Sequence, residues 1–163
     1  MTNKQLLETY ISKHINSIYR FAYTYTTNKE DAEDVVNESV LKALKSINSL
    51  RNPNQIGTWL YRIVANTALT NIKKNRKIVC MDPVDMADVQ YDGDDFSDIS
   101  FEQMIGVLEP KYKSIIVLRF FEGMPLEDIA LILDENLNTV KTRLYKALKI
   151  LRIEMEGAVW TKN

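Results

Sequence analysis

The chain has 163 residues, of which 45% are hydrophobic and 26% are charged, and its formal net charge is −1. This composition is typical of a soluble globular protein and excludes a disordered or fibrous chain. No stretch approaches the roughly 20 apolar residues of a membrane-spanning helix, and the N-terminus lacks a signal sequence, so we expect a cytoplasmic protein. With one cysteine, Cys80, and one histidine, His14, we expect no internal disulfide, metal site or cofactor.

The near-neutral net charge conceals an uneven distribution of charge. Residues 1–78 contain 12 Lys and Arg against 6 Asp and Glu, whereas residues 79–100 contain 7 aspartates and no basic residue. A polyanionic partner is therefore not excluded. Residues 79–100 also include a proline and a glycine and show no helical period. We predict that they form an acidic linker between two domains, residues 1–78 and 101–163.

Two long helices are predicted in the first part of residues 1–78. In the first helix, apolar residues recur every three to four positions from Leu7 to Tyr25, with either Ile15 or His14 in the stripe. His14 is expected to be a half-buried packing residue. Asn28 is predicted to cap the second helix, whose first turn is acidic and so suits the helix dipole.

A third helix is predicted to begin with Asn52 as its cap and Pro53 at its first position. Either Trp59 or Leu60 is expected to face inward, and Trp59 is interpreted as a core residue. Residues 73–77 at its end include four cations, which admit two interpretations. One or two cations would compensate the helix dipole, and four exceed that need, so contact with phosphates is favoured.

Residues 125–152 predict a helix-turn-helix. A short helix starts near Pro125, a break follows at residues 134–136, and a second helix is capped by Asn136. Its outer face has no acidic residue between Asn138 and Arg152, whereas an ordinary solvated face would mix signs. Side chains on this face that can donate to phosphates and base edges are Asn138, Thr139, Lys141, Thr142, Arg143, Lys146 and Lys149.

Four segments, in this order, resemble the conserved regions of the extracytoplasmic-function sigma factors, group IV of the sigma-70 family. They are DAEDVVNESVLKAL (residues 31–44), WLYRIVANTAL (59–69), LEPKYKSIIVLRFFEGMPLEDIALIL (108–133) and NTVKTRLYKALKILR (138–152). A single helix-turn-helix match would be weakly specific. Four ordered matches around an acidic linker cover nearly the whole chain and are strongly specific.

The resemblance implies a division of roles. The helix of residues 31–44 would dock on the coiled coil of the largest subunit of core RNA polymerase, through Asp31, Asp34, Asn37 and Glu38. The loop of residues 46–54 would capture a flipped base of the minus-ten element, and the following helix would contact that element and help to melt it. The minus-ten residues implied are Asn48, Arg51, Asn54, Arg62, Asn66, Lys73, Lys74 and Arg76. The helix-turn-helix would bind the minus-thirty-five element as duplex.

The implied partners are therefore core RNA polymerase, promoter DNA and an anti-sigma factor, which in this family is often membrane-bound. The implied function is promoter-specific initiation of transcription of stress-response genes. The protein would then associate with the nucleoid when active, or be held at the membrane by its inhibitor.

The sequence departs from the family pattern at four positions. Asn37 stands where glutamine is usual, Val40 where phenylalanine is usual, and Thr70 where aspartate is common. Asp134 replaces a glycine in the turn of the helix-turn-helix. Because Asp tolerates a left-handed backbone better than most residues, we expect the turn to survive.

The expected fold is all-α, with two small helical domains joined by an acidic linker. The linker of 22 residues could extend over roughly 70 to 80 Å, and it could act either as a polyanion mimic or as a plain acidic tether. An enzyme is not expected, because no nucleophile, paired carboxylate or phosphate loop occurs at meaningful spacing. The alternatives are a dimeric DNA-binding regulator that acts without polymerase and an all-helical adaptor.

Overall fold

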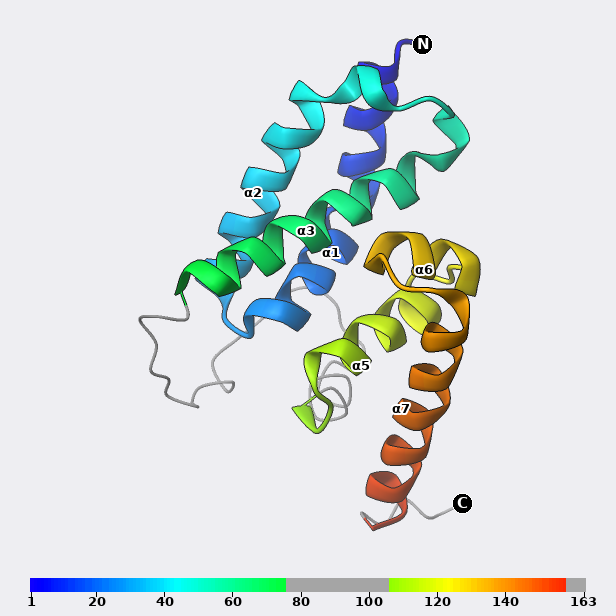
Figure 1. The fold of residues 1–163 in the computed structure, drawn as a ribbon. Helices are drawn as coiled ribbons and strands as arrows, with labels where there is room; N and C mark the ends of the chain where they lie inside the picture. The colour runs from blue at the N-terminus through cyan, green and yellow to red at the C-terminus, as the bar shows by residue number, and fades with distance from the viewer. Residues whose placement is uncertain (76–105, 158–163) are drawn as a thin grey trace. The chain divides into compact units, whose positions relative to one another are not determined.

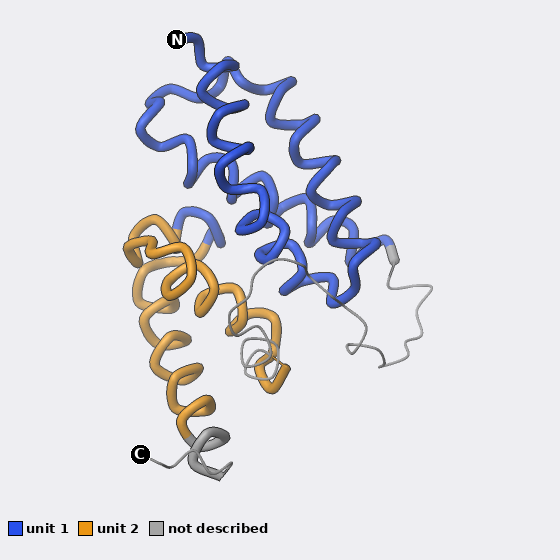
Figure 2. Tube along the Cα trace, turned by 180° about the vertical axis from the view of Figure 1, so that it is seen from behind, with its two compact units in different colours: residues 1–90, 131–134 blue, residues 91–130, 135–163 orange. Residues whose placement is uncertain are grey.

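The computed structural model describes residues 1–75 and 106–157, and the regular structure within those ranges is entirely helical (Figure 1). The chain divides into two compact units, residues 1–90 with 131–134, and residues 91–130 with 135–163 (Figure 2). The predicted all-α fold with two small helical domains is confirmed. The predicted domain limits at residues 78 and 101, the acidic segment and Cys80 lie outside the described residues.

Three helices pack against one another in the first unit: α1 (Asn3–Thr26), α2 (Lys29–Lys45) and α3 (Ile56–Asn75). Each contributes apolar side chains to one shared core, as the helical periods predict. The largest fully buried members are Leu7, Ile18, Phe21, Val35, Leu60, Tyr61 and Val64. Burial of this common core is what makes three amphipathic helices of this length stable together.

Helix α1 departs from regular geometry at His14, whose backbone is non-helical (φ −118°, ψ 18°). Its Nδ1 lies 2.9 Å from the carbonyl oxygen of Tyr10, and the two rings stack with centroids 4.0 Å apart. His14 is half-buried, as predicted, whereas Ile15 is 40% exposed. Of the two residues considered for the buried stripe, His14 is therefore the one that turns toward the core.

Helix α2 begins as the sequence predicts. The side chain of Asn28 accepts a hydrogen bond of 2.8 Å from the backbone N–H of Asp31, which satisfies a donor that the helix leaves free. The Asn28 amide also donates to the Asp31 carboxylate at 2.9 Å. The chain enters this cap from α1 through Thr27, whose left-handed φ of 57° ends α1.

The start of α3 differs from the prediction. Asn52 accepts a hydrogen bond of 3.0 Å from the N–H of Asn54, so it caps the 3₁₀ turn η2 (Pro53–Gln55), and α3 follows only at Ile56. Another 3₁₀ turn, η1 (Ile47–Ser49), leaves α2. Leu50 between the two turns is buried and its carbonyl accepts from the side chain of Asn3, so the loop is anchored to α1.

The second unit contains α5 (Pro110–Ile116), which continues into a π-helical turn η4 (Val117–Phe121), then α6 (Leu126–Leu133) and α7 (Leu137–Gly157). Gly123 has φ +67°, which favours glycine, and it ends the η4 turn. Helix α5 packs against α7. The buried apolar side chains shared by these elements include Ile115, Val117, Leu118, Ile129, Val140, Leu144, Ala147 and Leu151.

Candidate functional site

The helix-turn-helix forms where the sequence predicts it. Asp134 adopts the left-handed conformation (φ 58°) expected of the residue that replaces glycine, and the N–H of Glu135 donates to the carbonyl of Ala130 at 3.0 Å. Asn136 then caps α7 by accepting a hydrogen bond of 2.8 Å from the N–H of Thr139. These local bonds fix where α7 begins and which side chains face outward.

Most of the predicted duplex-binding residues lie on the exposed side of α7. Asn138, Lys141, Thr142, Lys146 and Lys149 are exposed, and Thr139 is half-buried beside the cap. At about 100° of rotation per residue, Asn138, Thr142 and Lys149 fall on one stripe of the helix. This stripe is polar and cationic, with free donors suited to phosphates and base edges.

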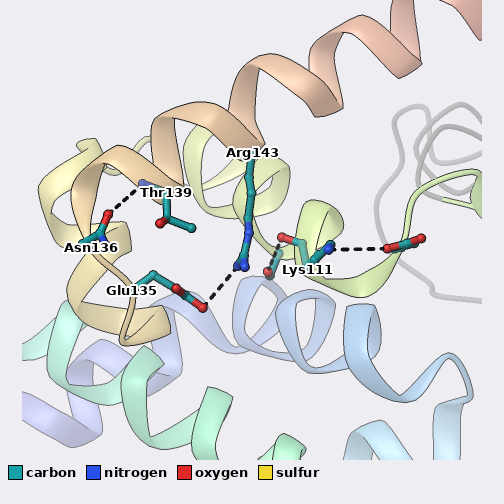
Figure 3. Close-up of polar contacts among 7 residues, drawn as sticks. Lys111, Glu135, Asn136, Thr139 and Arg143 are labelled. Carbon is teal, nitrogen blue, oxygen red and sulfur yellow. Dashed lines mark hydrogen bonds and ion pairs between the residues drawn. The ribbon is translucent and has the colours of Figure 1, made fainter.

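Arg143 differs from its neighbours on α7. Its guanidinium Nη1 donates to the Glu135 carboxylate Oε2 at 3.2 Å, and the two side chains are only 27% and 35% exposed. Figure 3 shows Arg143 directed from α7 toward the turn, where Glu135 precedes the capping Asn136. Arg143 is thus a predicted duplex-binding residue whose positive charge is paired with a carboxylate of the same unit.

Sequence reasoning missed Tyr145, which is 69% exposed and lies on the same stripe as Asn138, Thr142 and Lys149. An aromatic ring in that position presents a flat apolar surface among donors. A helical projection of residues 138–152 could have found it, because the buried residues Val140, Leu144 and Ala147 define the opposite face.

The predicted polymerase-docking residues share helix α2 and differ in what they contact. Asp34 and Asn37 are exposed, whereas Asp31 is partly buried and bonded to the Asn28 cap. Leu41, seven residues after Asp34, is 59% exposed on the same face and was missed by sequence reasoning. An exposed leucine beside carboxylate and amide groups is the arrangement of an interface anchor with a polar rim.

Glu38 lies at the edge of this face and joins α2 to α3. Its carboxylate is 3.6 Å from the Lys42 ammonium and accepts from the Asn71 amide at 3.5 Å. Lys42 in turn donates to the buried Thr67 hydroxyl at 3.2 Å. Glu38 therefore lies beside the docking face, and its polar contacts also hold α2 and α3 in register.

The predicted minus-ten residues occupy the loop before α3 and the exposed face of α3. Those that are exposed are Asn48, Arg51, Asn54, Arg62, Asn66, Lys73 and Lys74, while Arg76 lies outside the described residues. Trp59 is half-buried, not a core residue as predicted, and its indole N–H donates to the Ser49 hydroxyl at 3.3 Å. The reason is that Leu60 takes the inward position and Trp59 turns toward the loop.

No group of three metal-ligating side chains is found among the residues that the structure describes. Within the same ranges, no helix is long and apolar enough to span a bilayer. Burial lowers the pKa of the Lys113 ammonium, which lies on α5.

Comparison with known proteins finds two family matches, Sigma-70 region 2 over residues 10–78 and Sigma-70, region 4 over residues 98–151. The RNA polymerase sigma factor SigV of Bacillus subtilis is 44% identical over 155 residues, and the match covers 94% of this chain and 93% of SigV. The ECF RNA polymerase sigma factor SigW of the same organism is 28% identical, and the match covers 86% of this chain and 83% of SigW.

Two solved structures have a similar fold. The sigma factor RpoE of Bartonella quintana, crystallised with the anti-sigma factor NepR, has a TM-score of 0.75 at 22% identity, covering 91% of this chain and 96% of its own. CnrH, in complex with the cytosolic domain of CnrY, has a TM-score of 0.66 at 18% identity. The match covers 93% of this chain and 88% of the CnrH chain.

Proposed function

The chain belongs to the extracytoplasmic-function group of the sigma-70 family of RNA polymerase sigma factors, and we propose that its two helical units divide promoter recognition between them. The chain is a transcription initiation factor, and the chemistry of RNA synthesis belongs to the polymerase that it joins. The observation that best supports the division is the presence of separate exposed donor faces, one on α3 with its preceding loop and one on α7.

The second unit would bind the minus-thirty-five element as duplex. The side chains of Asn138, Thr142 and Lys146 project from the N-terminal half of α7, which is the end of a recognition helix that enters the major groove. Lys141 and Lys149 would contact phosphates, and Tyr145 would lie against a base edge or sugar. Thr139 would approach the backbone beside the cap, where free N–H groups favour anions.

The first unit would open the minus-ten element and hold it open. Unstacking a base costs a few kcal/mol, so a loop that binds the extruded base stabilises the separated strand. Asn48, Arg51 and Asn54 supply exposed polar groups in such a loop, and Leu50 anchors it to the bundle. Arg62, Asn66, Lys73 and Lys74 extend the donor surface along α3, and Arg76 is proposed as a further minus-ten contact.

Core polymerase would dock on α2 through Asp34, Asn37 and Leu41, with Asp31 and Glu38 at the margins of the face. Acidic and amide groups around one exposed leucine suit a basic helical partner surface. The segment of residues 79–100 would connect the domains and allow them to hold two promoter elements at once.

We further propose control by an anti-sigma factor, anchored at the membrane, that keeps the protein from polymerase until a stress signal arrives. The support is the fold shared with the sigma factor RpoE, solved with the anti-sigma factor NepR, and with CnrH, solved with the cytosolic domain of CnrY. Free protein would then reside in the cytoplasm and associate with the nucleoid as part of holoenzyme.

The test is reconstitution with core RNA polymerase. The purified chain should co-elute with core enzyme, and the resulting holoenzyme should select discrete promoters from a genomic fragment pool and form open complexes that core enzyme alone does not form. A dimer that binds a palindromic duplex and does not associate with core enzyme would contradict the proposal.

A further inference from the structure

The cations of residues 137–149 in α7 fall into two groups. Lys141, Lys146 and Lys149 are exposed, whereas Arg143 is turned back into an ion pair with Glu135 (Figure 3). Arg143 also follows Thr142 directly, so it lies about 100° around the helix from Thr142, which belongs to the exposed stripe. The guanidinium of Arg143 is therefore placed at the flank of the face that the proposed function assigns to DNA.

Glu135 is well placed to hold Arg143. Its backbone N–H is bonded to Ala130, the preceding Asp134 is left-handed, and the following Asn136 caps α7, so the Cα of Glu135 has little freedom. A hydrogen bond between a guanidinium and a carboxylate is stronger than one between neutral groups. Partial burial of the pair also reduces the screening of its attraction by salt. The carboxylate also lies at the N-terminus of α7, where the helix dipole favours negative charge.

We propose that Glu135 is a positioning residue that holds Arg143 against the turn, so that Arg143 does not contact DNA. This inference rests on the proposed function of α7 as the duplex-binding helix. Its consequence is that Glu135 removes one cation from the phosphate-binding surface. Phosphate contacts do not depend on base sequence, so the loss of one lowers the affinity for every duplex equally. The preference among duplexes is set by the base contacts and does not change.

The test uses holoenzyme and a pool of promoter duplexes randomised over the minus-thirty-five element. Four variants are compared with wild type: Glu135→Gln, Arg143→Met, the double variant, and Glu127→Gln as a control. Glu127 is an exposed carboxylate at the start of α6 with no contact to Arg143, so its variant makes the same charge change without releasing the guanidinium. Gln keeps the shape of Glu135, and Met keeps the stem of Arg143, which preserves their packing.

Glu135→Gln should steepen the dependence of log affinity on log salt by about 0.9, the increment of one added phosphate contact on duplex DNA. Over a fourfold rise in salt, the variant should therefore lose roughly three- to fourfold more affinity than wild type. Arg143→Met should leave the salt slope and the selected bases unchanged, and the double variant and Glu127→Gln should both keep the wild-type slope.

The inference is overturned if Arg143→Met flattens the slope or changes the preference at a base pair, since Arg143 would then contact DNA despite Glu135. It is equally overturned if Glu135→Gln leaves the slope unchanged, or steepens it in the Arg143→Met background as well. Failure of the proposed function would be distinguishable, because wild-type holoenzyme would then select no element from the pool.

Discussion

The two helical units use their surface polar groups in different ways. In the first unit, Glu38 and Lys42 lie beside the docking face and also join α2 to α3 through Asn71 and Thr67. In the second unit, the donors along the exposed stripe of α7 stand apart from the core. Substitutions on the first unit therefore risk changing both binding and packing, whereas those on the α7 stripe should affect binding alone.

The largest expected effect comes from the docking face of α2. Asp34→Arg combined with Leu41→Arg should abolish co-elution with core polymerase, because both side chains are exposed and the change inverts the charge and removes the apolar anchor. The free energy of unfolding should stay within about 0.5 kcal/mol of wild type.

Glu38→Arg provides the contrast on the same helix. It places a second cation beside Lys42 and removes the acceptor for Asn71, so it should lower stability as well as docking. Glu8→Arg on the exposed side of α1 is the control, and it should change neither property. Normal polymerase binding by the folded Asp34→Arg, Leu41→Arg variant would remove α2 from the docking surface.

The second prediction separates the two DNA-binding units. Lys146→Ala in α7 should cost about 1 to 3 kcal/mol of promoter binding if the side chain recognises a base edge, and should alter preference at particular minus-thirty-five base pairs. Lys73→Ala with Lys74→Ala should instead weaken binding evenly across sequences and flatten its salt dependence.

A promoter assembled already open in the minus-ten region distinguishes these defects further. It should restore open complexes to the α3 variant, because strand separation is then provided, and should not restore them to Lys146→Ala. Lys13→Ala on α1 serves as a cation-loss control. Equal rescue of both variants would show that the units do not divide recognition in this way.

Local signals in the sequence predicted much of this structure. Asn28 and Asn136 cap the helices they were expected to cap, and Asp134 takes the left-handed turn position. Each is a property of one residue and its near neighbours, which a sequence displays directly.

What the sequence could not predict depends on distant neighbours or on deviations from the ideal period. The non-helical backbone at His14 shifts which α1 residues face inward. A prediction from a regular period of about 3.6 residues assumes an unbroken helix and so cannot show this shift. The Glu135–Arg143 pair spans a turn whose geometry had to be known first. The residue-level site assignments on α2, α3 and α7 remain predictions for the experiments above.

The third prediction concerns the core of the second unit. Lys113 on α5 is only 8% exposed, no described acidic side chain pairs with it, and burial lowers its pKa from the ordinary value of 10.5. Lys113→Met should stabilise the protein by about 1 kcal/mol at neutral pH, because the variant keeps the stem and avoids burying a charge.

The pH dependence gives a signature of that cause. As pH rises from the lowered pKa of folded Lys113 toward 10.5, the unfolded state binds more protons than the folded state, so the cost of burying the charge declines. The advantage of Lys113→Met in chemical denaturation should therefore be full at neutral pH and shrink toward pH 10.5. A constant difference would mean that packing, not charge, separates the two proteins.

The smallest effect is expected in the first unit, where α1 approaches the first turn of α3. A Cβ at Gly57 would lie 2.7 Å from the Tyr10 hydroxyl oxygen and 3.2 Å from its Cζ, which is too close without movement of the ring. Tyr10 is stacked on His14, so the ring cannot move without weakening that contact. Without this clash, alanine would stabilise the helix relative to glycine by roughly 0.5 to 1 kcal/mol.

Gly57→Ala should therefore destabilise the wild type slightly, by less than about 1 kcal/mol, and become neutral or stabilising in a Tyr10→Phe background, where the hydroxyl is absent. Denaturation of the four members of this double-mutant cycle measures the coupling between the two positions. The same change in free energy of unfolding for Gly57→Ala in both backgrounds would show that the hydroxyl of Tyr10 does not limit how closely α1 and α3 pack.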